Sequence, residues 1–178
     1  MPPSRQPRTA RRRTPPTRRV VFYVFPQFIS LDLVGPWEVF NVANHLAGPG
    51  HTPYRLQLVT ADSRAQVNSQ SGLALLPNRP VRTVRGDVDT LVVPAAVGID
   101  QIPPAQVKRS AFARLAARSR RVVGICGGAF LLAAAGLLDG RRATSHWLVC
   151  EQLAACYPDV TVEPNAIYVK HDHVYTSA

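Results

Sequence analysis

Cysteine is scarce in this chain of 178 residues, which contains only three. An odd and sparse set of cysteines excludes the disulfide framework of a small secreted protein, so we expect a cytoplasmic protein in a reducing compartment. Long apolar runs are also missing. Residues 129–138 are apolar apart from one glycine, but a membrane helix needs about 20 such residues, so we expect no membrane partner. Apolar side chains nevertheless make up 46% of the chain, which excludes a wholly disordered protein.

Acidic side chains are absent from residues 1–19, which contain seven arginines and five prolines. This segment accounts for most of the formal net charge of +10, and residues 20–178 are close to charge balance. Because the segment has almost no apolar side chains, nothing offsets the entropy of ordering its backbone. We expect a disordered tail over residues 1–19 and one domain over residues 20–178. The tail is interpreted as a solvated extension, with weak attraction to phosphate as the alternative.

Strand-like and helix-like segments alternate after the tail, which predicts an α/β fold with a mostly parallel sheet and helices on both faces. Because the chain stops at Ala178, directly after a predicted strand, we expect it to be truncated before a covering helix. Strands are predicted over residues 20–25, 56–61, 90–93, 122–126, 160–162, 166–170 and 174–176, a hairpin over 66–77, and helices over 32–46, 104–119, 129–138 and 147–157.

A cysteine lies where one predicted buried strand meets a predicted helix. Residues 121–132 are RVVGICGGAFLL, so Cys126 follows the strand and precedes Gly127 and Gly128. This is the layout of a nucleophile elbow, a tight turn that strains the backbone of the nucleophile and needs small neighbours. The positive end of the helix would lower the pKa of the thiol, and the Gly127 amide would point at a developing oxyanion. The alternative is a buried, unreactive cysteine.

Five histidines are present, and His146 is the one best placed to assist a thiol. It lies one helix after the elbow, at the same carboxyl edge of the predicted sheet, where open α/β folds bind ligands. Capping the next helix is its alternative role. His171 and His173 could face one metal, but no third ligand has a diagnostic spacing, so we expect no metal site. We expect Cys150 and Cys156 to be packing residues.

Four stretches of the chain resemble the ThiJ/PfpI family, within the class I glutamine amidotransferase-like superfamily. They are LDLVGPWEVF at 31–40, the elbow at 121–132, AGLLDGRRATSHW at 135–147 and VYTSA at 174–178. The similarity is strongest to the amino-terminal domains of GlxA-like AraC-type transcriptional regulators, with isonitrile hydratases as near relatives. The resemblance spans about residues 19–178. It implies a flavodoxin-like three-layer sandwich, often a homodimer, and no cofactor.

The resemblance also implies site residues. The family's nucleophile corresponds to Cys126, its histidine to His146 and its acidic residue to Asp32. Asp32 would hydrogen-bond the thiolate or act as acid and base, whereas a purely structural acid at a helix start is the competing explanation. The residues expected to contact the ligand are Gly127, Gly128 and Ala96.

Two departures from the family pattern weaken an enzymatic interpretation. Relatives carry Pro-Gly-Gly after the central strand, but this chain has Pro94, Ala95 and Ala96. If that turn needs a positive φ, alanine is strained there and an oxyanion amide is misplaced. Hydratase-like relatives carry Thr or Ser after the cysteine, whereas Gly127 offers no hydroxyl.

The sequence therefore predicts the ligand-sensing amino-terminal domain of an AraC-type transcriptional regulator. Its ligand would be an unidentified small molecule, and DNA would be bound through a C-terminal domain that is missing from this chain. The alternative is a cysteine-dependent enzyme of the same family: isonitrile hydratase-like, an amidase, or glutamine amidotransferase-like. In that enzyme Cys126 would attack an electrophilic carbon while His146 or Asp32 moves the proton.

Overall fold

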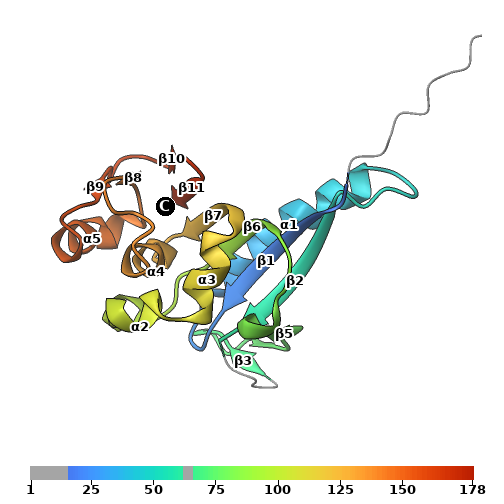
Figure 1. Ribbon diagram of the computed structural model, residues 1–178, viewed down its shortest axis with the longest axis horizontal. Coiled ribbons are helices and arrows are strands. Elements are labelled where there is room, and N and C mark those ends of the chain that lie inside the picture. The colour runs from blue at the N-terminus through green and yellow to red at the C-terminus, as the bar shows by residue number, and fades with distance from the viewer. Residues whose placement is uncertain (1–15, 62–65) are drawn as a thin grey trace, which may run out of the picture.

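The computed structural model describes residues 16–61 and 66–178, in which strands and helices alternate as the sequence predicts (Figure 1). The strands are β1 (Arg18–Val24), β2 (Tyr54–Thr60), β3 (Val67–Asn68), β4 (Ala74–Leu75), β5 (Arg79–Pro80), β6 (Val88–Val93), β7 (Ser119–Ile125), β8 (Arg142–Ala143), β9 (Thr161–Val162), β10 (Tyr168–His171) and β11 (Val174–Ser177). The α-helices are α1 (Ser30–Leu46), α2 (Pro104–Lys108), α3 (Ala111–Ala117), α4 (Gly128–Ala134) and α5 (Cys150–Cys156), and the 3-10 helices are η1 (Val81–Thr83), η2 (Ile99–Gln101) and η3 (Trp147–Val149).

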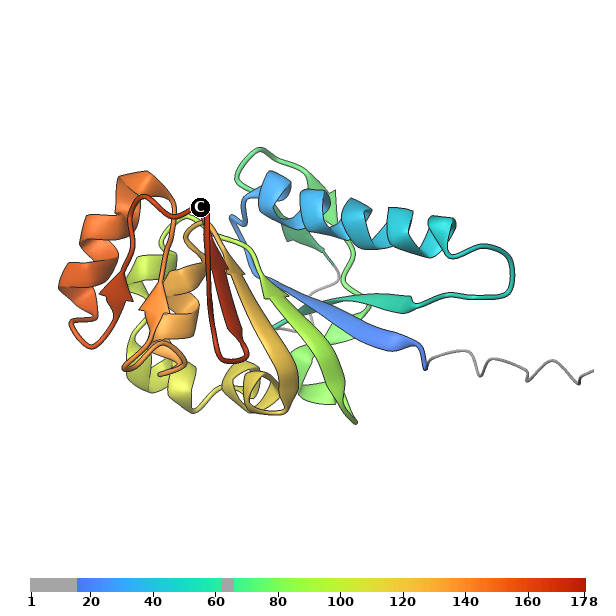
Figure 2. The same ribbon diagram turned by 90° about the horizontal axis from the view of Figure 1, so that it is seen from above.

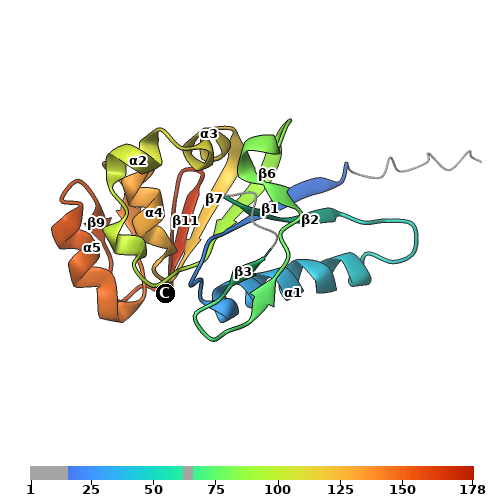
Figure 3. The same ribbon diagram turned by 90° about the horizontal axis from the view of Figure 1, so that it is seen from below.

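The central sheet contains seven strands in the order β10-β11-β7-β6-β1-β2-β5. Every neighbouring pair is parallel except β10 and β11, which form an antiparallel hairpin. Helix α1 covers one face of the sheet, and α2, α3 and α4 cover the other (Figures 2 and 3). The expected mostly parallel sheet with helices on both faces is confirmed. Because β1, β6 and β7 run parallel, their carboxyl ends share one edge of the sheet and their amino ends share the opposite edge.

The core lies between these layers. In β1, the five residues from Val20 to Val24 are at most 8% exposed. An unbroken apolar run fits a strand that is covered by helices on both faces. Every residue of α4 is buried as well, so this short helix is held by packing on all sides.

The start of the chain differs from expectation. β1 begins at Arg18, so the last two residues of the expected tail belong to the sheet, and the Thr17 hydroxyl donates to the carbonyl of Thr52 at 2.8 Å. Residues 1–15 of the expected tail lie outside the described residues. α1 begins at Ser30, two residues before the predicted start at residue 32, and Pro36 lies inside it.

Two predicted helices have different bounds. The predicted helix over 104–119 is two helices, because Ser110 caps α3 and its hydroxyl accepts the N–H of Ala113 at 3.2 Å. The predicted helix over 129–138 ends at Ala134, because Gly136 adopts a left-handed conformation with φ 78°. The predicted hairpin over 66–77 is present as β3 and β4. In the described part of the chain, no helix has the length and apolar content to cross a bilayer.

Candidate functional site at the carboxyl edge of the sheet

Cys126 lies in the tight turn between the end of β7 and the start of α4. Its φ is 53°, in the left-handed region that residues other than Gly and Asn rarely adopt. This conformation costs about 1–3 kcal/mol and persists only where neighbours enforce it. Two segments do so: the Cys126 N–H donates to the carbonyl of Ser177 at 2.9 Å, and the hydroxyl of Ser145 donates to the Cys126 carbonyl at 2.7 Å.

Gly128, the first residue of α4, packs against the end of β6. A Cβ atom at this position would lie 2.3 Å from the carbonyl oxygen of Val93, so only glycine lets the helix approach this closely. Gly128 is buried and is not among the residues that line the cavity beside Cys126, so its expected contact with a ligand stays a prediction. Its role in the turn is close packing.

A cavity of about 540 Å³ opens beside Cys126. Gly127 and Ala96, both expected at the ligand site, are part of its wall. None of the described residues lining it is lysine or arginine, and most are apolar. The polar and ionisable side chains in the wall are Asp32, Asp100, Cys126, His146 and Gln152. The structure therefore brings Cys126, His146 and Asp32 to one cavity, although they come from three separate segments.

Asp32 lies in the first turn of α1 and reaches toward the turn at Cys126. Its Oδ2 accepts the N–H of Ala95 at 3.1 Å. Burial raises the pKa of Asp32 above its ordinary value, and this effect outweighs the hydrogen bond from Ala95, the charge of His146 and the hydrogen bond with Cys126, which all lower it. The carboxyl therefore interacts electrostatically with both the Cys126 thiol and His146.

The pKa of the Cys126 thiol is raised, mainly by burial and next by the negative charge of Asp32. A hydrogen bond from the Gly127 amide lowers this pKa, but less than burial raises it. The expectation of a lowered pKa is therefore wrong. The physical reason is that burial and the nearby carboxylate both disfavour the thiolate, and the positive end of a helix of seven residues does not offset them.

His146 precedes η3 and accepts the backbone N–H of Leu148 at its Nδ1, at 3.2 Å. A neutral imidazole that accepts at Nδ1 carries its proton on Nε2, so the free side of the ring is a donor. The ring also stacks on Trp147, with 5.7 Å between centroids. Within residues 16–61 and 66–178 no hydrogen bond joins His146 to the sulfur, and Asp32 is the ionisable group whose charge acts on the thiol.

The turn after β6 contains Ala95 and Ala96 without a positive φ, so the strain considered for Pro94-Ala95-Ala96 is absent. The Ala95 N–H is occupied by Asp32. Ala96 faces Phe28 as a non-hydrogen-bonded pair, because the flanking bonds run from Ile29 to Ala95 and from Val97 to Gln27. The Ala96 N–H has no acceptor among the described residues.

Comparison with known proteins is decisive for the family, because the DJ-1/PfpI family model matches residues 18–178. The chain belongs to the DJ-1/PfpI family. Among curated relatives, it is 41% identical over 140 residues to an uncharacterized protein from the cpoL 5' region of Streptomyces lividans, covering 79% of this chain and 95% of that protein. This DJ-1/PfpI chain is also 32% identical over 133 residues to the isonitrile hydratase of Pseudomonas putida, covering 72% and 52% respectively.

Transcriptional regulators are also relatives of this DJ-1/PfpI chain. It is 28% identical over 170 residues to the HTH-type transcriptional regulator GbdR of Pseudomonas aeruginosa, covering 92% of this chain and 44% of the regulator. The chain thus spans about half of the hydratase and less than half of this regulator. Among solved structures, a ThiJ/PfpI family protein from Pseudomonas syringae superposes with a TM-score of 0.75 at 26% identity, covering 99% of this chain and 69% of that one. The flavodoxin-like α/β fold of the family is therefore confirmed.

The remaining residues considered from sequence lie away from the cavity of this DJ-1/PfpI domain. His171 and His173 flank the turn between β10 and β11, and His171 Nδ1 accepts the N–H of Arg142 at 3.0 Å. No cluster of three metal-ligating side chains occurs in the part of the chain that the structure describes. Cys150 is buried as expected, but Cys156 is exposed, so the expectation that it packs in the interior is wrong.

Sequence reasoning missed Ser145 and Ser177, which hold the peptide groups of Cys126. A signal was present, since both lie in stretches that carry the family resemblance, directly before His146 and near the end of the chain. Their role was not deducible, because the contacts join residues that are 19 and more positions apart. Burial of Ser145 at 0% exposure is consistent with this structural role.

Proposed function

We propose that this chain is the ligand-sensing domain of an AraC-type transcriptional regulator acting in the cytoplasm. The cavity beside Cys126 would take the small molecule, and DNA would be bound through a separate domain of the longer regulator. Support comes from the HTH-type regulators among the relatives, one of which aligns with 92% of this chain. Support also comes from the cavity of about 540 Å³, which falls within the ordinary size range of small-molecule sites.

The observation that carries the proposal is the largely apolar cavity at which Asp32, Cys126 and His146 converge, and the raised pKa of the Cys126 thiol supports a binding role there. At neutral pH such a sulfur is protonated, and a thiol is a much weaker nucleophile than a thiolate. A protonated thiol remains a hydrogen-bonding and packing surface, which suits recognition better than covalent chemistry. Polar groups that converge on an apolar cavity are the usual way in which a binding site sets orientation.

Each polar group would have a distinct part in recognition. The Nε2–H of His146 and the free N–H of Ala96 are donors, and the Asp32 carboxyl is the acceptor. The wall, as far as the structure describes it, holds no lysine or arginine, so a carboxylate or phosphate on the ligand would lack a charged partner. The cavity therefore favours a small, largely apolar molecule that is neutral or cationic.

A thermal-shift screen of small metabolites tests this proposal. The protein is screened in parallel with Ala96→Phe, which fills the cavity from a wall position that is 8% exposed. We expect hits that raise the melting temperature of the wild type but not of the variant. Hits that act equally on both proteins would place binding elsewhere and contradict the proposal. Matched melting temperatures without ligand show that the variant is folded.

A cysteine-dependent enzyme is the second candidate, and the electrostatic interaction between the thiol and Asp32 at one cavity favours it. In this mechanism the sulfur forms a bond to an electrophilic carbon, and the thiol proton passes to the Asp32 carboxylate. The Gly127 and Ala96 amides would stabilise negative charge on the substrate. The 32% identity to an isonitrile hydratase also supports this candidate.

Incubating the screening hits with protein separates the two candidates. A sensor binds its ligand and releases it unchanged, so mass spectrometry finds no product. An enzyme consumes the hit, and Cys126→Ala abolishes the consumption. The coding sequence downstream of residue 178 gives an independent answer, since two helix-turn-helix units there would support the regulator.

We also propose that the domain is a homodimer. Helix α1 exposes an apolar stripe that a monomer would leave in water, and Leu31, Val39 and Leu46 on it are 76%, 67% and 77% exposed. Sedimentation velocity measures the oligomeric state directly. A dimer that Val39→Asp converts to monomer supports the proposal, and a monomeric wild type contradicts it.

A further inference from the structure

The edge of the sheet opposite Cys126 is rich in arginine. Two cavities lie there, at the amino ends of β1, β6 and β7, with volumes of about 680 and 270 Å³. The first is lined by Arg18, Arg19, Arg118 and Arg120, and the acids in its described wall are Asp87 and Asp89. The second is lined by Arg82, Arg85, Arg114 and Arg118, and no acid contributes to its described wall. Because Arg118 lines both cavities, the two described walls contain seven different arginines. We call these the arginine edge: Arg18, Arg19, Arg82, Arg85, Arg114, Arg118 and Arg120.

Several guanidinium groups of the arginine edge are held by neutral partners. Arg118 donates to the carbonyls of Gly86 at 3.1 Å and Val84 at 2.5 Å, and Arg85 donates to the carbonyl of Arg82 at 2.6 Å. Arg19 donates to the carbonyl of Arg85. A carbonyl orients a guanidinium without cancelling its charge. These groups are therefore positioned in advance and remain fully cationic.

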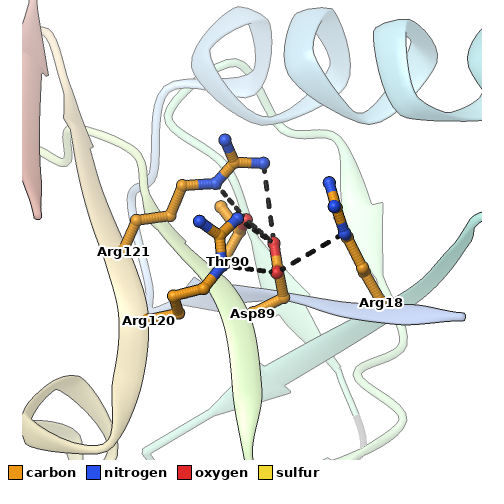
Figure 4. Close-up of polar contacts among 5 residues, drawn as sticks. All are labelled: Arg18, Asp89, Thr90, Arg120 and Arg121. Atoms are coloured by element: carbon orange, nitrogen blue, oxygen red, sulfur yellow. Dashed lines mark hydrogen bonds and ion pairs between the residues drawn. The ribbon is translucent and has the colours of Figure 1, made fainter. Parts of the chain in front are cut away.

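Of the two carboxylates in the described wall, Asp89 is shared among three arginines. Asp89 accepts two hydrogen bonds from Arg120, at 2.7 and 3.0 Å, and lies 3.6 Å from Arg121 and 3.9 Å from Arg18 (Figure 4). Thr90 completes the group, since it donates to Asp89 and accepts from Arg121. One negative charge cannot neutralise three guanidinium groups, so a net positive charge remains at this site.

We propose that the arginine edge binds the phosphodiester backbone of a nucleic acid. Every cation of the edge is arginine, whose planar donors match phosphate oxygens better than the ammonium of lysine does. The cations continue across two neighbouring cavities that share Arg118, which suits a polymer with repeating charge rather than a single anion. None of the exposed large apolar side chains of the described residues lines either cavity, whereas a membrane-binding surface needs such side chains.

This site is separate from the cavity at Cys126. The strands between the two edges have six or seven residues, so the edges are about 20 Å apart. Binding at the arginine edge reads no base sequence, and it would add affinity to whatever sequence-specific contacts another domain makes.

The test is fluorescence anisotropy of a short DNA duplex with the full 178-residue chain, between about 50 and 200 mM salt. The double variant R82E/R114E reverses two exposed charges of the edge. Its matched control, R79E/K108E, makes the same charge change at exposed residues that line neither cavity. Residues 1–19 are identical in all proteins, so their arginines contribute equally.

We expect R82E/R114E to weaken DNA binding at least about tenfold and to lower the salt slope by about two, because two phosphate contacts are lost. The control should stay within about threefold of the wild type. Equal weakening by both variants, or by neither, would overturn the proposal. Binding to phosphatidylserine vesicles without binding to DNA would overturn it too. If R82E/R114E does not fold, R82Q/R114Q replaces it and should weaken binding by a smaller factor than reversal, while R79Q/K108Q leaves binding unchanged.

Discussion

Replacing Gly128 by alanine tests the turn that presents Cys126. The added Cβ would lie 2.3 Å from the Val93 carbonyl oxygen, whereas carbon–oxygen contacts are normally no closer than about 3.3 Å. The overlap of about 1 Å is between backbone-attached atoms, so α4 and β6 must move apart. We expect a loss of about 3 kcal/mol in the free energy of unfolding, which lowers the melting temperature by about 6–12 °C.

Differential scanning calorimetry measures this change, and Gly35→Ala is the matched control. Apart from its chain neighbours and the backbone of its own helix, no described heavy atom lies within 4 Å of the Cβ built at Gly35, and the residue is inside α1, where alanine adds about 0.5–1 kcal/mol. Gly35→Ala should therefore melt at or above the wild-type temperature. A Gly128→Ala protein that melts within about 2 °C of the wild type would refute the close approach.

Three further predictions follow from the site and from the Asp89 cluster. Asp32→Asn removes the negative charge that raises the pKa of Cys126, so iodoacetamide should alkylate Cys126 faster near pH 8. An unchanged alkylation rate relative to Cys156 would contradict the electrostatic effect of Asp32 on the thiol. Ser145→Ala removes the 2.7 Å hydrogen bond to the Cys126 carbonyl and should lower the free energy of unfolding in urea by about 1–2 kcal/mol. An unchanged free energy of unfolding would show that this hydrogen bond does not stabilise the turn. The pKa of Asp89 is lowered because the hydrogen bonds and positive charge of Arg120, together with Thr90 and Arg121, outweigh the effect of burial. The ionised Asp89 carboxylate therefore adds to the free energy of unfolding above its unfolded pKa of about 4, and this contribution is lost as the pH falls through its lower pKa in the folded protein. Asp89→Asn should therefore be less stable than the wild type at pH 7, and the difference should shrink in acid; a constant difference would contradict the linkage.

Sequence patterns predicted the architecture because the relevant signals are local. The apolar run of β1 and the strand–Cys–Gly–Gly–helix order around Cys126 both follow from neighbouring residues. Bounds were less predictable where a single side chain decides them. Ser110 splits one predicted helix by capping α3, and Gly136 ends α4 early through its left-handed backbone.

The electrostatics of the site depend on tertiary structure and were predicted in the wrong direction. A strand-to-helix turn suggested a lowered thiol pKa, but burial of Cys126 and its contact with Asp32 raise it. These two residues are far apart in the chain, so no local pattern reports their distance. The placement of Cys126 and His146 at one cavity did follow from the rule that parallel strands place their carboxyl ends at one edge, whereas Asp32 was expected there only from the family resemblance.

The most direct test of the central claim is the alkylation rate of Cys126 as a function of pH, followed by peptide mass mapping with the exposed Cys156 as internal reference. The account predicts that Cys126 reacts slowly near neutral pH and accelerates only above the ordinary thiol pKa of about 8.5, because it is protonated beside Asp32. It also predicts that a hit from the thermal-shift screen protects Cys126 and leaves Cys156 unprotected. Rapid modification of Cys126 near pH 6 would contradict this account and would identify an activated nucleophile.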